Sequence, residues 1–197
     1  MIRLILVRHG ETDSSRRGTF CGWTDSPLNE EGKRQARTAA SKLTGIPIDI
    51  IYSSPSKRAL ETAEIINNAL GLRITCFNDL RERNFGRWED LTYSDIGNTY
   101  PGELSKWQND WVNYRIEDGE SAYQAHERVA AFADNLIKVN SNRVCLVVTH
   151  AGCIRSILSH LLGMGIGAMW RFKIECGGVT SVEITDDGYA YLTMLNG

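Results

Sequence analysis

Two histidines and two arginines, far apart in the sequence, are the side chains best suited to chemistry on an anion. They are Arg8, His9, Arg58 and His150. Fixed guanidinium charges repel a metal cation, but they bind phosphate well because arginine offers a bidentate fork to phosphate oxygens. A helix N-terminus beside them would add backbone donors for the same anion. The residue types therefore predict a phosphate site that holds no metal ion.

These residues must converge to act together, and the apolar runs before them indicate how. The runs are typical of strands buried on both faces of a parallel sheet: Ile2–Val7, Ile48–Tyr52 and Val144–Val148. Arg8 and His9 follow the first run directly. Arg58 lies shortly beyond the second run, and His150 lies shortly beyond the third. Ligands of open α/β sheets bind beyond the carboxyl ends of the strands, so we expect all four side chains at one rim.

The rest of the chain alternates in the manner of an α/β fold. A further strand is predicted at Arg73–Phe77, and helices at Asn29–Leu43, Ser54–Leu70, Ser121–Val139 and Ile154–Leu162. In the second of these helices Ser54 would be the cap and Pro55 the first residue. We expect a mostly parallel, doubly wound sheet with helices on both faces, formed by a single domain over residues 1–197.

Two segments depart from this alternation. Near the C-terminus three short apolar runs are separated by glycine turns typical of hairpins: Phe172–Ile174, Val179–Ile184 and Tyr189–Leu195. They predict antiparallel strands at one edge of the sheet. Residues Asn84–Gly119 are polar, contain three of the five tryptophans and hold no strand-like run, so we expect a small helical cap there.

Composition and charge narrow the choice of partners. The chain is 42% hydrophobic and 23% charged with a net charge of -2, so neither nucleic acid nor an anionic membrane is expected as a partner. Five scattered cysteines without a C-x-x-C pair indicate reduced thiols. The short N-terminal run, interrupted by Arg3, does not have the pattern of a signal peptide. We therefore expect a cytoplasmic protein, and the sequence leaves open whether it forms a homodimer.

Four motifs resemble, in this order, those of the histidine phosphatase superfamily, which includes the cofactor-dependent phosphoglycerate mutases. They are LVRHGET at Leu6–Thr12, YSSPSKRALETA at Tyr52–Ala63, LRERNFGRWE at Leu80–Glu89 and VVTHAG at Val147–Gly152. Less specific segments, among them WQNDW at Trp107–Trp111, make the chain most similar to the α-ribazole phosphatases within that superfamily. The resemblance implies a phosphomonoester hydrolase that uses neither a metal ion nor another cofactor.

The resemblance also implies a role for each matching residue. His9 would be the nucleophile that forms a phosphohistidine, and Glu82 would protonate the leaving alkoxide and then activate water. The equatorial phosphate oxygens would be bound by Arg8, Arg58 and His150. Weaker substrate contacts are implied for Thr12, Ser15 (where many relatives have asparagine), Cys21, Gly22 and Ala151. A neutral His9 further requires a carbonyl partner for its second ring nitrogen.

Three functions remain open at this point. The first is a phosphatase for a small phosphomonoester, with α-ribazole 5′-phosphate as the best single candidate and sugar or metabolite phosphates as the broader alternative. The second is a mutase, although mutases of the superfamily tend to be longer, with extra cap segments. The third is a non-catalytic phosphate-binding module, against which the joint presence of His9 and Glu82 argues. Trp107 and Trp111, four residues apart, fit either core packing or a substrate platform.

Overall fold

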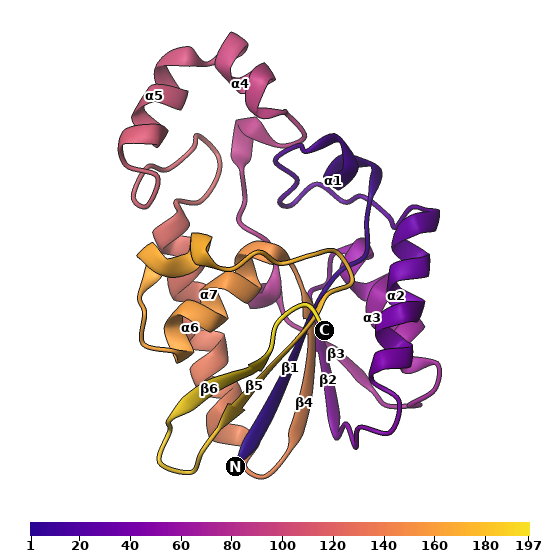
Figure 1. Cartoon of the computed structure of the whole chain (residues 1–197). Coiled ribbons are helices and arrows are strands. Elements are labelled where there is room, and N and C mark those ends of the chain that lie inside the picture. The colour runs from indigo at the N-terminus through magenta and orange to yellow at the C-terminus, as the bar shows by residue number, and fades with distance from the viewer.

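A six-stranded sheet in the order β3-β2-β4-β1-β5-β6 forms the centre of the computed structural model, which describes residues 1–197 (Figure 1). The strands are β1 (Ile2–Arg8), β2 (Ile50–Ser53), β3 (Ile74–Cys76), β4 (Val144–Thr149), β5 (Val179–Ile184) and β6 (Ala190–Met194). The first four strands pair in parallel, whereas β5 runs antiparallel to both β1 and β6. The predicted α/β fold with an antiparallel edge is therefore confirmed.

The register of the parallel strands brings their carboxyl ends level with one another. Arg8 at the end of β1 pairs with Thr149 at the end of β4. Ser53 at the end of β2 pairs with Val148 of β4. The residues that follow these three strands consequently emerge side by side, at the rim where ligands of open α/β sheets bind.

Helices cover both faces of the sheet because alternate strand residues point to opposite faces. Leu4 and Leu6 pack with α6 (Ala122–Val139) and α7 (Ala151–Leu161). Ile5 and Val7 pack with α2 (Glu30–Lys42) and α3 (Lys57–Asn67) on the other face. Strand β1 is thus apolar on both sides, which explains its unbroken apolar run.

The segment between residues 84 and 119 carries α4 (Tyr93–Thr99) and α5 (Pro101–Asn109) and lies beyond the carboxyl ends of the strands (Figure 1). It has a small hydrophobic core of its own, formed by Trp88, Ile96, Leu104 and Ile116. A short helix, α1 (Asp13–Arg17), lies near it, on the segment that follows β1 (Figure 1). The rim of the sheet is therefore covered by non-sheet segments from two parts of the chain.

Two local predictions are wrong. Residues 172–174 form no strand; they follow a 3-10 helix, Ile166–Arg171, and the Ile174 carbonyl accepts a hydrogen bond from Arg8 instead of a neighbouring strand. The helix predicted to begin at Ser54-Pro55 begins at Lys57 and is preceded by Ser56, because the Ser54 hydroxyl contacts His150 and the Ser56 amide. No helix of the fold combines the length and apolar character needed to cross a bilayer.

Candidate active site

A cavity of about 310 Å³ opens above the carboxyl ends of β1 and β4, and we call it the polar cavity. Eight of the ten predicted site residues line it: Arg8, His9, Thr12, Ser15, Cys21, Arg58, Glu82 and Ala151. His150 and Gly22 do not line it. The strand-end residues that are distant in sequence therefore converge on one space, as the topology predicts.

The His9 imidazole is fixed in one tautomer by its backbone surroundings. Its Nδ1 lies 2.7 Å from the Gly10 carbonyl oxygen, which can only accept, so Nδ1 carries a proton and donates it. The ring is 5% exposed, and burial, together with the charges of Arg58 and Arg8, holds the pKa of His9 well below 6.5. The ring is consequently neutral at neutral pH, and Nε2 keeps a free lone pair. This is the carbonyl partner that a nucleophilic His9 requires.

His150 lies behind His9, out of contact with solvent. The two rings are 5.1 Å apart between centroids, edge to face. Arg58 Nε donates to His150 Nδ1 at 3.3 Å, so the proton of His150 resides on Nε2, which donates to the Ser54 hydroxyl at 2.9 Å. Burial and the charge of Arg58 also hold the pKa of His150 well below 6.5. Both ring nitrogens thus have partners within the protein, and one of these partners is Arg58.

The two arginines are held in different ways. Arg58 is 1% exposed, and besides His150 its guanidinium donates to three carbonyls of the loop after α1, those of Cys21, Gly22 and Thr24. Arg8 donates through one Nη to the Ile174 carbonyl at 2.7 Å, while its buried Nε has no partner in the chain. A buried donor without a partner is costly. At the wall of a cavity it is suited to an anion that enters the site.

Glu82 is anchored by two backbone amides. One carboxylate oxygen accepts from the Gly152 amide at 2.9 Å and the other from the Arg83 amide at 3.0 Å. Gly152 belongs to the first turn of α7, where an anionic side chain is favourable. A methyl group in place of the Gly152 hydrogen would lie 2.2 Å from a Glu82 oxygen, so the glycine is what lets the carboxylate come this close.

The weaker predicted contacts are already engaged within the protein. The Thr12 hydroxyl caps α1 by accepting from the Ser15 amide, and the Ser15 hydroxyl accepts from the Thr12 amide in return. The Gly22 amide donates to Glu89 and the Cys21 amide to the Thr19 carbonyl. Burial raises the pKa of the Cys21 thiol. These residues shape the loop around the polar cavity. A ligand that contacts them directly must either displace these hydrogen bonds or bind to atoms that do not take part in them.

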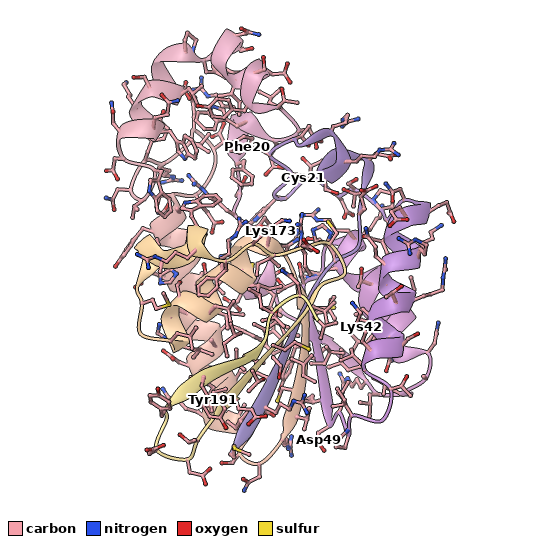
Figure 2. The ribbon with its side chains drawn as sticks, in the orientation of Figure 1. Phe20, Cys21, Lys42, Asp49, Lys173 and Tyr191 are labelled. Atoms are coloured by element: carbon pink, nitrogen blue, oxygen red, sulfur yellow. The ribbon has the colours of Figure 1, made fainter.

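A second cavity of about 180 Å³ adjoins the first, and we call it the apolar cavity. The two cavities share four lining residues, namely Phe20, Glu82, Phe85 and Ala151. Figure 2 shows Phe20 and Cys21 between the α4–α5 segment and the rim of the sheet, which is where this boundary lies. Glu82 therefore stands between a polar compartment and an apolar one.

Several residues of the site were missed from the sequence. The polar cavity is also lined by Gly18, Thr19, Phe20 and Phe85. The Ser54 hydroxyl accepts a hydrogen bond from His150. Phe20 belongs to the same matching stretch as Cys21 and Gly22, from which only the latter two were predicted as contacts, and Phe85 lies inside one of the four motifs. Closeness in sequence to predicted site residues could have indicated Phe20 and Phe85. Their contact with the polar cavity, however, depends on how the loop after α1 folds against the α4–α5 segment.

Comparison with known proteins agrees with this geometry. The sequence model of the histidine phosphatase superfamily (branch 1) matches residues 4–197. The adenosylcobalamin/alpha-ribazole phosphatase of Escherichia coli is 31% identical over 195 residues, covering 99% of this chain and 96% of that protein. Phosphoserine phosphatase 1 of Hydrogenobacter thermophilus is 32% identical over 186 residues, covering 94% and 88%. The crystal structure of the alpha-ribazole phosphatase from Shigella flexneri superposes with a TM-score of 0.94 at 29% identity, covering 99% of this chain and 96% of that one.

Proposed function

Since this chain belongs to the histidine phosphatase superfamily and is a phosphoric monoester hydrolase, we propose that it forms a phosphohistidine on His9 and hydrolyses α-ribazole 5′-phosphate. The observation that carries the mechanism is the state of His9. Its Nδ1 is bound to the Gly10 carbonyl and its pKa is held well below 6.5, so Nε2 carries no proton. The residue lines a cavity that Arg8 and Arg58 also line. An unprotonated imidazole nitrogen of this kind can attack the phosphorus atom of a phosphomonoester.

In the first step, His9 Nε2 attacks the phosphorus and the bond between phosphorus and the ester oxygen breaks. The departing oxygen takes a proton from Glu82 in its acid form, and the product alcohol leaves through the apolar cavity. Arg8 and Arg58 stabilise the charge that spreads over the equatorial oxygens in a phosphoryl transfer. The unpartnered Nε of Arg8 supports this role, because phosphate supplies the acceptor that the chain does not.

In the second step, water attacks the phosphorus of the phosphohistidine. The Glu82 carboxylate takes a proton from this water, and the phosphorus–nitrogen bond breaks to release phosphate and restore neutral His9. A single carboxylate can serve both steps because it lies at the boundary of the two cavities, next to both the leaving group and the incoming water. His150 contributes by holding Arg58 and the edge of the His9 ring.

The choice of substrate rests on the relatives. Proteins called α-ribazole phosphatases match this chain over almost its whole length, both in sequence and in fold. Phosphoserine phosphatases match it with similar identity, so phosphoserine is the natural competing substrate. A measurement of kcat/KM for both compounds decides between them, and a higher value for phosphoserine would reject α-ribazole 5′-phosphate.

The test of the mechanism is the trapping of a phosphoenzyme. Quenching in base during turnover of a labelled phosphomonoester should give a phosphorylated protein whose label is lost in acid, as a phosphoramidate requires. His9→Ala should abolish both the label and the turnover. A label that survives in His9→Ala, or that maps to His150, would contradict the assignment of the nucleophile.

His150→Ala serves as the comparison variant. It leaves the attacking nitrogen in place but removes the acceptor of Arg58 Nε. We expect labelling to persist and to be slower by roughly 10–150-fold, which corresponds to one lost hydrogen bond to a charged group.

A further inference from the structure

We propose that the apolar cavity binds a flat aromatic ring carried by the leaving alcohol, with Trp111 and Trp170 as the residues that determine this specificity. The inference rests on the proposed function, because it assumes that the phosphate occupies the polar cavity. It goes beyond that function by assigning the selection of the substrate to particular side chains. It also predicts a class of substrates, namely phosphomonoesters whose alcohol bears an uncharged planar ring.

The position of the cavity determines which part of a substrate reaches it. A phosphate held by Arg8 and Arg58 directs its ester oxygen toward the proton donor, Glu82. Glu82 and Ala151 line both cavities, so a group attached to that oxygen continues past them into the apolar cavity. The apolar cavity is thus the space for the alcohol and not a separate ligand site.

The walls of the cavity are suited to stacking. Trp107 and Trp111 come from α5 and the turn after it, whereas Trp170 belongs to the 3-10 helix after α7. The rings of Trp111 and Trp170 are 5.8 Å apart between centroids at an interplanar angle of 68°, so they pack edge to face and form a corner in the cavity wall. Aromatic faces in such a corner contact a flat ring in stacked and edge-on geometry at the same time.

Trp170 is 60% exposed, which is a large apolar surface to leave in water. One contact restrains it, since the Arg155 guanidinium lies 4.8 Å from the centre of its ring. Arg155 itself donates through Nε to the Phe172 carbonyl at 2.9 Å. A tryptophan restrained while exposed, at the mouth of an apolar cavity, offers a preformed surface for a ring that would cover it.

The same walls are poorly suited to the ammonium group of an amino acid. Phosphoserine carries this ammonium group beside a carboxylate, and the cations of Arg83 and Arg155 in the cavity lining match only the carboxylate. Arg83 already donates to the Glu120 and Tyr114 carbonyls and is largely buried. An ammonium group would have to lose its water next to these charges, with Glu82 as the only carboxylate in the lining. A neutral ring avoids that cost.

The experiment compares kcat/KM for four substrates that share the phosphate but differ in the alcohol. α-Ribazole 5′-phosphate and adenosine 5′-monophosphate carry a flat ring on ribose, ribose 5-phosphate carries the sugar alone, and phosphoserine carries charges. For the wild-type enzyme we expect both ring-bearing substrates to exceed ribose 5-phosphate by about 5–150-fold, the effect of one stack between a base and an aromatic side chain.

Trp111→Ala and Trp170→Ala should each remove most of that advantage while changing kcat/KM for ribose 5-phosphate by less than about threefold, since the latter substrate makes no stack. Tyr191→Ala is the matched control, because it removes a partly exposed aromatic side chain at the far end of the molecule (Figure 2). It should leave all four values unchanged. Equal losses on ribose 5-phosphate and on the ring-bearing substrates would overturn the proposal.

The two hypotheses fail in different ways. An enzyme that labels His9 but hydrolyses ribose 5-phosphate as well as the ring-bearing substrates keeps the proposed mechanism and loses the ring pocket. If no phosphoenzyme forms with any substrate, the mechanism fails, and calorimetry with α-ribazole, which has no phosphate, tests the pocket alone. Binding that weakens in Trp111→Ala but not in Tyr191→Ala supports the pocket, and equal binding to both variants rejects it.

Discussion

The two histidines of the site share a shifted pKa but have different surroundings. Both are buried beside Arg58, and both are held neutral because a second positive charge in that place would be poorly solvated. His9 uses one ring nitrogen for a carbonyl and leaves the other free, whereas His150 uses both. The number of free nitrogens, and not the pKa, therefore separates a candidate nucleophile from a positioning residue.

Replacing the candidate acid should affect substrates unequally. Glu82→Gln keeps the size of the side chain but cannot transfer a proton, so alkyl phosphates with poor leaving groups should lose about 10²–10⁴-fold in kcat. Aryl phosphates, whose leaving groups need no proton, should lose much less in the first step. Rates of phosphoenzyme formation for one alkyl and one aryl substrate check this, and an equal loss on both would indicate a purely structural Glu82.

Exhaustive chelation should leave activity unchanged. Two guanidiniums occupy the place where a metal-dependent phosphatase would bind a divalent cation to the phosphate. Turnover measured after prolonged dialysis against EDTA, with and without added Mg²⁺, is the direct check. Loss on dialysis that Mg²⁺ restores would reject the mechanism.

At the scale of elements, the ends of strands are what the sequence predicts best. Unbroken apolar runs defined β1, β2 and β4, and the rule for ligands of open sheets then brought Arg8, His9 and Arg58 to one rim. The predicted start of α3 was wrong because Ser54 is a good cap by residue type, yet its hydroxyl contacts His150, which follows β4. Local preference cannot reveal a partner that is 96 residues away.

The wall of the apolar cavity was beyond prediction for the same reason. From the sequence, Trp107 and Trp111 fitted either core packing or substrate binding. In the structure, the two tryptophans line the apolar cavity. Trp170 lies in a segment, Gly163–Ile174, that resembles the α-ribazole phosphatases, but it was not predicted as a site residue. Its contact with Trp111 depends on how the α4–α5 segment lies against the 3-10 helix Ile166–Arg171. Sequence patterns describe elements well, but they do not describe how two irregular segments meet.

The first turn of α7 offers a test at this scale. In Gly152→Ala the new methyl group would lie 2.2 Å from a Glu82 oxygen, so the carboxylate must move away from the boundary of the cavities. We expect the kinetic defect of Glu82→Gln, up to about 10²–10⁴-fold on alkyl phosphates. Gly102→Ala in α5, where nothing lies within 4 Å of the added methyl, is the control and should keep full activity.

If Gly152→Ala retained wild-type kinetics on alkyl phosphates, proton transfer by Glu82 would not depend on the position of its carboxylate at the start of α7. Thermal unfolding of both variants shows whether the fold is intact. Alanine is the better helix former by about 1 kcal/mol, so neither variant should be less stable because of helix propensity.

At the scale of the whole molecule, two hydrophobic layers enclose the sheet and a third, smaller core supports the α4–α5 segment. The two neutral histidines lie where the sheet meets this segment. Their burial links the stability of the entire fold to pH, because the unfolded chain exposes both rings to water.

Stability should decrease as the pH falls below about 6.5, where the unfolded chain takes up protons on His9 and His150 while the folded chain does not. The loss should continue until the lowered pKa of each folded-state ring is reached. Each ring contributes at most about 1.4 kcal/mol per pH unit. Urea unfolding between about pH 7.5 and about pH 5.5 measures the slope. His9→Gln should flatten it, and an unchanged slope would show that His9 does not titrate on unfolding.

The two histidines and the tryptophans of the apolar cavity stand on different parts of the chain. Both histidines follow the two central strands, β1 and β4, whose residues form the layers of the core. The tryptophans of the apolar cavity stand on α5, the turn after it and a short 3-10 helix, away from those layers. After a gene duplication, one copy could therefore acquire a new substrate through mutations in these segments alone. Phosphoryl transfer would be inherited intact.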